Sequence, residues 1–342
     1  MAAFARTIGI DYSGAETPTA SLKGLRVYLA EGHGHPVEVP PPSSPRKYWT
    51  RKGIAEWLVE RLAEDAPSLV GIDHGFSFPL RYFEVHGLLP DWPRFLDDFQ
   101  RHWPTDEDHV YVEFVRDGIA GNGAARMGNA GWRRLTEERA GGAKSVFQFD
   151  VQGSVAKSTH AGIPWLRFIR QRLGKRVHFW PFDGWDIPAG RSAIAEVYPA
   201  LWSRGFTNEG RTGDQHDAFS ITAWLSYADR DGSLAALLKP DLSPPERARA
   251  QVEGWILGVT EAKLRTRKNT VRHYASDGHR LVRPDNPANA RVCPECGHVF
   301  RGGTWGGIDA HWNALHGKIM PYADAWLIIR AGGKPSSKRS LV

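Results

Sequence analysis

The sequence predicts an α/β protein: a mixed sheet flanked by helices, followed by a small module of cysteines and histidines. Short apolar runs typical of strands alternate with helical patterns over about residues 5–259. Two of those runs end alike, in "RTIGIDYSG" (residues 6–14) and "LVGIDHGFS" (residues 69–77). The only two cysteines stand together in "CPEC", with histidines behind them. These three observations also mark the candidate functional residues.

The composition is that of an ordinary globular protein. The chain has 342 residues, of which 41% are hydrophobic and 24% charged, and its length predicts a main domain with an appendage. The formal charge of +6 is compatible with a polyanionic partner. The N-terminus carries no apolar signal segment, and no run approaches membrane-spanning length. We expect a soluble, cytoplasmic protein with no membrane partner, and the oligomeric state stays open.

The first strands and helix come in an informative order. Strands are expected at 6–12, 24–30 and, more weakly, 36–39; a helix follows from Thr50 to about 64, and then the strand "SLVGID". This order is found in RNase H-like sheets, in which the first and fourth strands lie side by side in parallel. We therefore expect the two Gly-Ile-Asp runs to be neighbours.

The rest of the chain divides into an insert, the end of the main domain and a C-terminal part. A less regular insert over about 76–190 precedes the strand "SAIAEVY" and a helix at about 217–231, and the main domain closes near 259. We expect a basic connector at 260–289, the Cys/His module with a last helix at 290–330, and a disordered tail at 331–342.

The repeated aspartates form the centre of a candidate site. Alternate residues of a strand share a face, so Gly9 and Asp11 lie on one face, and Gly71 and Asp73 on one face of the other strand. If the strands are neighbours, both carboxylates emerge together from a surface that the glycines leave uncrowded. Such a pair repels itself at neutral pH, and a divalent cation such as Mg²⁺ relieves the repulsion.

Further acids extend this candidate site. Glu196 lies near the end of "SAIAEVYP", and Asp214 and Asp217 are three residues apart at a helix start. Asp11, Asp73, Glu196 and Asp217, with Asp214 as a possible addition, could hold two Mg²⁺ or Mn²⁺ ions for phosphodiester hydrolysis. Simpler roles stay open: strand-end turns for the first two, a helix cap at Asp214 or Asp217, and a solvated edge for Glu196.

The motifs "GIDYSG", "GIDHGFSFP", "AEVYPALW", "DQHDAFSITAWL" and "EGWILGV", in that order, resemble a family of predicted nucleases with an RNase H-like fold, domain of unknown function 429. The motif "DQHDAFSITAWL", which contains the last of the candidate acids, is also similar to the Asp-Ala helix start of Holliday-junction resolvases. The resemblance covers roughly residues 5–259 and implies that Asp11, Asp73, Glu196 and Asp217 occupy the family's acidic positions. The long Trp-rich insert and the Cys/His module depart from the family pattern and leave substrate choice open.

A polar cluster before an amphipathic helix is a candidate for substrate binding. "GSVAKSTHAGIPWLRFIRQ" offers Lys157, Ser158, Thr159 and His160 where a helix N-terminus could meet a phosphate. The alternative is a helix cap with a surface lysine.

The C-terminal module predicts a zinc site. Cys293, Cys296, His311 and His316 have the spacing C-x2-C-x14-H-x4-H, and two thiolates with two imidazoles select Zn²⁺. The pattern resembles a Cys2His2 zinc finger with a ββα fold and a loop two residues longer than usual. His298 is a competing imidazole, poorly placed to close such a site. Nucleic-acid positioning, aided by the basic connector, and structural stapling are both open roles.

These residues together favour a metal-dependent nuclease that acts on DNA or RNA. Two other classes remain. An actin-like ATPase or sugar kinase is one, because Asp11–Gly14 and Asp73–Gly75 faintly resemble phosphate loops, but only 62 residues separate them. The other is a non-catalytic nucleic-acid-binding or scaffold protein. DNA against RNA, substrate preference and pathway are not determined by the sequence.

Overall fold

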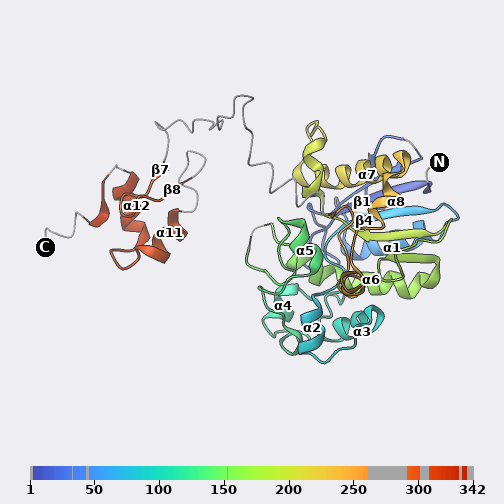
Figure 1. Ribbon diagram of the computed structural model, residues 1–342, viewed down its shortest axis with the longest axis horizontal. Coiled ribbons are helices and arrows are strands. Elements are labelled where there is room, and N and C mark those ends of the chain that lie inside the picture. Colours follow the sequence, from blue (N-terminus) through green and yellow to red (C-terminus); the bar gives the residue numbers. More distant parts are fainter. Residues whose placement is uncertain are drawn as a thin grey trace. The chain divides into compact units, whose positions relative to one another are not determined.

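The computed structural model describes residues 3–32, 34–43, 46–151, 153–260, 291–300, 308–330 and 333–336. The chain forms two compact units, residues 1–269 and 270–342 (Figure 1). The expected basic connector at 260–289 lies outside the described residues from residue 261 on, as does most of the expected disordered tail at 331–342.

The first unit is built around a six-stranded mixed sheet. Its strands are β1 (Arg6–Asp11), β2 (Arg26–Glu31), β3 (Val37–Glu38), β4 (Ser68–Asp73), β5 (Val177–Trp180) and β6 (Ser192–Glu196). Their order is β3-β2-β1-β4-β6-β5; β1, β4, β6 and β5 are parallel, and β2 is antiparallel to β1 and β3. The predicted α/β class and mixed sheet are confirmed, and so is the parallel pairing of the first and fourth strands.

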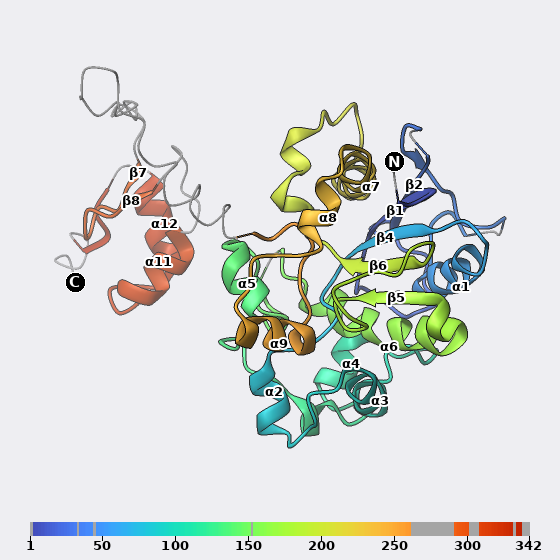
Figure 2. The same cartoon turned by 45° about the vertical axis from the view of Figure 1, so that its right-hand side comes forward.

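Helices cover both faces of this sheet. They are α1 (Arg51–Leu62), α2 (Leu80–Val85), α3 (Trp92–His102), α4 (Val112–Arg116), α5 (Leu135–Ala140), α6 (Ala156–Leu173), α7 (Gly213–Asp231), α8 (Ser233–Leu237) and α9 (Pro244–Glu253). Short 3₁₀ turns lie at Gly123–Arg126, Gly174–Arg176, Pro199–Leu201 and Ser203–Gly205. Helix α7 lies on one face and α1 and α6 on the other (Figures 1 and 2). Within the described residues, no helix has both the length and the apolarity to cross a membrane.

The alternation of the central strands explains the two layers. Ile8 and Ile10 of β1 are fully buried in the core that α1 and α6 share with the sheet, together with Val70 and Ile72 of β4. The other face of β4 carries Leu69, which belongs to the core beneath α7. The insert between β4 and β5 extends the first core with aromatic rings, among them Phe78.

The second unit is small and closes around one tryptophan. It contains the antiparallel strands β7 (Arg291–Val292) and β8 (Val299–Phe300) and the helices α11 (Ile308–Leu315) and α12 (Tyr322–Arg330). Trp312 of α11 is fully buried, and its indole nitrogen donates to the Met320 carbonyl oxygen at 3.0 Å. Its neighbours in this core are Cys293, Ile308, Ala325 and Ile329.

Gly9 sets the distance between the sheet and α7, which leads to the first prediction. A Cβ at Gly9 would lie 2.5 Å from the Ala218 carbonyl oxygen, a backbone atom that cannot rotate away. We expect Gly9→Ala to lower the free energy of unfolding by about 1–3 kcal/mol, as overpacking does in other cores. Gly213→Ala is the matched control, since a Cβ there meets nothing within 4 Å. Equal urea midpoints for the two variants would show that α7 does not rest on β1 in this way.

Candidate functional site

The two predicted aspartates are brought together at the ends of neighbouring parallel strands. Asp11 is the last residue of β1 and Asp73 the last of β4, and the strands pair in the register Asp11 to Asp73. Because paired residues of neighbouring strands share a face, both side chains leave the sheet on the side of Gly9 and Gly71. The two Gly-Ile-Asp motifs are therefore neighbours in the structure.

The glycines of this face have a different role from the one expected. We expected them to keep the surface open, but α7 covers it. A Cβ at Gly71 would lie 2.8 Å from Ile221 Cγ2, and one at Gly9 would collide with the α7 backbone. The expectation was wrong because the open space left by the glycines is filled by the helix, which can approach the sheet only where side chains are missing.

This close approach places the start of α7 beside the strand ends. Asp214 and Asp217 precede Ala218 and Ile221 by one helical turn, and those two residues lie over the glycines. The helix begins with a capping box, in which the Thr212 side chain accepts from the Gln215 amide at 3.3 Å. The strand pair and the helix start therefore deliver four carboxylates to one region.

The carboxylates raise one another's pKa. Burial raises the pKa of Asp11 well above its usual value, and the charges of Asp73, Asp214 and Asp217 raise it further. Burial and then the charge of Asp217 do the same for Asp73. Burial also raises the pKa of Asp217, with a smaller contribution from Asp214. The neighbouring His216 partly offsets this rise for Asp217. Within the described part of the chain, none of the four carboxylates forms a salt bridge with a lysine or arginine.

Glu196 is held differently from these aspartates. It pairs in register with Ile72, one residue before Asp73, so its side chain leaves the sheet on the opposite face. There Arg134 binds both of its oxygens, with Nη1 to Oε2 at 2.7 Å and Nη2 to Oε1 at 2.6 Å. The Phe76 amide donates to Oε2 as well, at 3.1 Å. The expected metal-ligand role is therefore not supported, because the carboxylate is already bound by protein donors.

Arg134 belongs to a buried polar network that the sequence did not reveal. Its side chain is 1% exposed and also donates from Nε to Glu137 at 2.8 Å. Glu253, at the end of α9, accepts from the Leu80 and Leu135 amides at 2.7 Å each. This network joins β6, α5 and α9. Arg134 stands in the less regular insert, where no helical or strand periodicity marks it as a buried residue.

The polar cluster predicted to bind substrate is mostly used inside the fold. His160 and Thr159 are fully buried, and burial lowers the pKa of His160 to about 3, with its ring among aromatic side chains. Thr159 Oγ1 accepts from the Gly75 amide at 2.9 Å, and Ser158 Oγ donates to the Val155 carbonyl oxygen at 3.0 Å. Lys157, the one half-exposed member, pairs with Glu113. A phosphate contact by this set is therefore not supported, since helix α6 turns three of its members inward.

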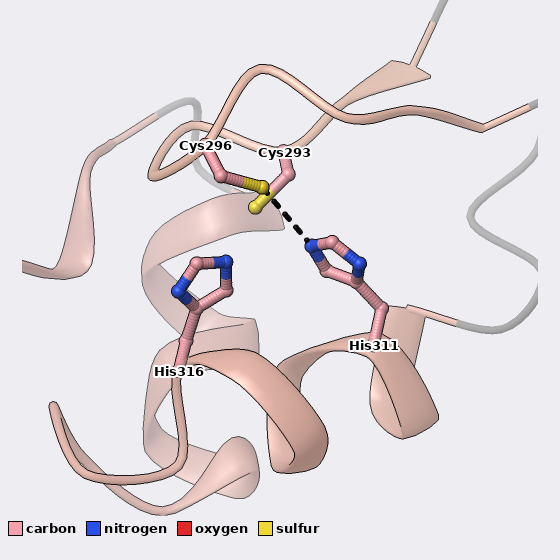
Figure 3. A group of neighbouring side chains, drawn as sticks. All are labelled: Cys293, Cys296, His311 and His316. Carbon is pink, nitrogen blue, oxygen red and sulfur yellow. Dashed lines mark hydrogen bonds between the residues drawn. The ribbon is translucent and has the colours of Figure 1, made fainter.

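The cysteine–histidine group is assembled as expected. One ligand atom each from Cys293, Cys296, His311 and His316 lies within 4.8 Å of every other. Figure 3 shows the two thiols from the hairpin and the two imidazoles from α11 and its end facing one point, with Cys296 Sγ 3.3 Å from His311 Nε2. Two sulfur and two nitrogen ligands in such reach suit Zn²⁺.

The two candidate centres differ in how closely their ligand atoms approach. In the described ranges, the cysteine–histidine group is the one set of three or more acidic, histidine or cysteine side chains whose ligand atoms all lie within 4.8 Å. The aspartate cluster is more open than that.

Comparisons with protein-family models, with curated proteins and with solved structures find no match to this chain.

Proposed function

We propose that this protein is a metal-dependent nuclease with an RNase H-like domain, and that Asp11, Asp73, Asp214 and Asp217 hold Mg²⁺ or Mn²⁺ to cleave DNA or RNA. The observation that carries the proposal is the register of Asp11 with Asp73 under the start of α7. The strand order β3-β2-β1-β4, with parallel β6 beyond, agrees with this fold assignment.

The donor set fits a hard divalent cation. Carboxylates that share a partly exposed site and lack a lysine or arginine partner are unfavourable at neutral pH, and a cation with oxygen preference removes that cost. When bound, two such cations activate a water molecule and stabilise the leaving oxygen of a phosphodiester. The protein supplies the rest: the strand pair fixes two ligands, and α7 brings the other two.

The C-terminal module is proposed to be a ββα zinc finger. The order of β7, β8 and α11 and the four ligands support this. Cys293 shares a core with Trp312 and α12, so Zn²⁺ would join the hairpin to the helices. We propose that this module stabilises the C-terminal unit and assists substrate engagement.

The test is a cleavage assay on a panel of single-stranded, duplex and branched DNA and RNA, with Mg²⁺ or Mn²⁺. The wild type should cut at least one substrate, and Asp11→Asn and Asp73→Asn should each lower the rate by about 10³-fold or more, as expected when a ligand of a catalytic metal is lost. Equal cleavage by all three proteins would contradict the proposal. ATP hydrolysis without cleavage would favour a phosphotransferase, and binding without either would favour a non-catalytic protein.

Zinc binding has its own test. Cys293→Ser should release one zinc per chain, measured by elemental analysis after dialysis, and should unfold the second unit, since metal binding and folding are coupled in such modules. His298→Ala is the control, because its ring contacts His311 but stands outside the four-ligand group. Full zinc content in Cys293→Ser, or zinc loss in His298→Ala, would show that the ligand set is wrong.

A further inference from the structure

Each backbone amide of residues 74–76, directly after Asp73, donates a hydrogen bond within the protein. The His74 amide donates to the Ile72 carbonyl oxygen at 3.1 Å, the Gly75 amide to Thr159 Oγ1 at 2.9 Å, and the Phe76 amide to Glu196 Oε2 at 3.1 Å. The last two acceptors are buried side chains from different elements, α6 and β6. Each of the three backbone amides after Asp73 therefore has a fixed partner.

The acceptors are fixed in turn. Glu196 is bound on both oxygens by Arg134, whose charge Glu137 shares, so the Glu196 carboxylate has no freedom to turn toward the aspartates. Thr159 is fully buried in the first turns of α6. There is also no space around this segment: a Cβ at Gly75 would lie 2.8 Å from Val146 and 2.9 Å from Thr159 Oγ1.

We infer that Thr159 and Glu196 are positioning residues for Asp73, and that Glu196 is not a metal ligand. This inference rests on the proposed metal site, for which it names Asp11, Asp73, Asp214 and Asp217 as the ligands. It also accounts for the acidic side chain at the end of β6, which Arg134 and the Phe76 amide already bind. Its charge balances Arg134, and its oxygen fixes the backbone behind Asp73.

We call the hydrogen bonds from the Gly75 and Phe76 amides to Thr159 and Glu196 the clamp, and it bears on the metal site. Asp73 is the last residue of its strand, and its carboxylate is repelled by Asp217 and Glu196. If the amides of residues 74–76 were not hydrogen-bonded, the end of β4 could shift and move the Asp73 carboxylate away from the charges that repel it. With these hydrogen bonds, Asp73 stays in register with Asp11, ready to share a cation. Groups that orient a ligand in this way commonly change metal affinity about 10–100-fold when they are lost.

Thr159→Val and Thr159→Ser test these hydrogen bonds: valine keeps the side-chain volume, and serine keeps the hydroxyl but lacks one methyl group. Valine removes the acceptor for the Gly75 amide, and serine keeps it. In hydrogen exchange, the segment around Gly75 should exchange faster in Thr159→Val and at the wild-type rate in Thr159→Ser. In a titration with Mn²⁺ followed by electron paramagnetic resonance, Thr159→Val should bind about tenfold more weakly, and Thr159→Ser should recover the affinity.

Glu196→Gln and Asp214→Asn separate positioning from ligation. Glutamine keeps an oxygen for the Phe76 amide, but its NH2 group then faces the Nη2 donor of Arg134. Glu196→Gln should therefore weaken Mn²⁺ binding no more than Thr159→Val does, and clearly less than Asp11→Asn. Asp214→Asn should lose about tenfold or more, as a ligand variant. A loss in Glu196→Gln as large as in Asp11→Asn would overturn the inference by making Glu196 a ligand.

The outcomes also separate this inference from the proposed function. Wild-type protein that binds no Mn²⁺ would refute the metal site, while the exchange experiment would still judge the clamp. Unchanged exchange around Gly75 in Thr159→Val, or equal Mn²⁺ affinity in the wild type and both Thr159 variants, would overturn the positioning role.

Discussion

Asp11→Asn will make the metal-free protein more stable at neutral pH and will remove its stabilisation by Mg²⁺. Asp11 is destabilising when ionised, because burial and three neighbouring aspartates raise its pKa. An amide of the same shape carries no charge, so we expect the free energy of unfolding to rise by about 1–3 kcal/mol at pH 8. A cation at ten times its dissociation constant should add about 1.4 kcal/mol to the wild type and little to the variant.

The pH dependence of this gain follows from the direction of the pKa. A carboxyl group whose pKa is raised in the folded state binds its proton more tightly there, so its stability contribution is lost as pH rises through the folded pKa. The difference between Asp11→Asn and the wild type should therefore be small near pH 4 and grow toward pH 8. Buried His74 and His160, with pKa values lowered to about 4 and about 3, act in the opposite direction between pH 4 and 6.5, but equally in both proteins.

Thermal unfolding of both proteins from pH 4 to 8, with EDTA and with Mg²⁺, checks this prediction. Because EDTA would also remove the zinc proposed for the second unit, the first unit is followed by its own transition or by hydrogen exchange around Asp11. A variant less stable than the wild type without metal, or equally stabilised by Mg²⁺, would contradict the electrostatic account.

Arg134→Met will destabilise the first unit strongly. Methionine fills much of the volume but leaves the carboxylates of Glu137 and Glu196 buried without their cation. Breaking a buried ion pair from one side commonly costs about 3–5 kcal/mol, and we expect that range here, measured by urea unfolding.

Arg167→Met is the matched control for this prediction. Arg167 also forms an ion pair, at 2.7 Å from Asp97, but both side chains are partly exposed, at 28% and 58%. Exposed pairs contribute about 0–1 kcal/mol, so this variant should unfold close to the wild type. A similar loss in both variants would mean that burial does not set the strength of the Arg134 network.

Local sequence patterns predicted the central strands of the sheet and several of the candidate site residues. Alternation within "RTIGID" and "SLVGID" identified β1 and β4, and their neighbouring positions followed from the order of elements. The spacing of Cys293 and Cys296 predicted that they lie together, and helical periodicity predicted the same for Asp214 and Asp217. These features depend on near neighbours or on simple periods, which a sequence displays directly.

The contacts that were not predicted are made between residues far apart in the sequence. Glu196 has the pattern of an acid at a strand end, but a one-residue offset in the pairing of β4 with β6 turns it to the opposite face. Its partner Arg134 lies 62 positions away, in a stretch without a regular pattern. His160 and Thr159 looked polar and accessible, yet the aromatic insert closes over them. A local sequence pattern does not show how two strands pair in register or which distant side chain a residue contacts.

Calorimetric titration of Mn²⁺ into the zinc-loaded protein compares the wild type with Asp73→Asn. The wild type should bind one or two Mn²⁺ ions, and Asp73→Asn should lose that binding while it keeps the fold and the zinc content. Absence of binding to the wild type, or equal binding by both proteins, would contradict a cation site at the paired strand ends.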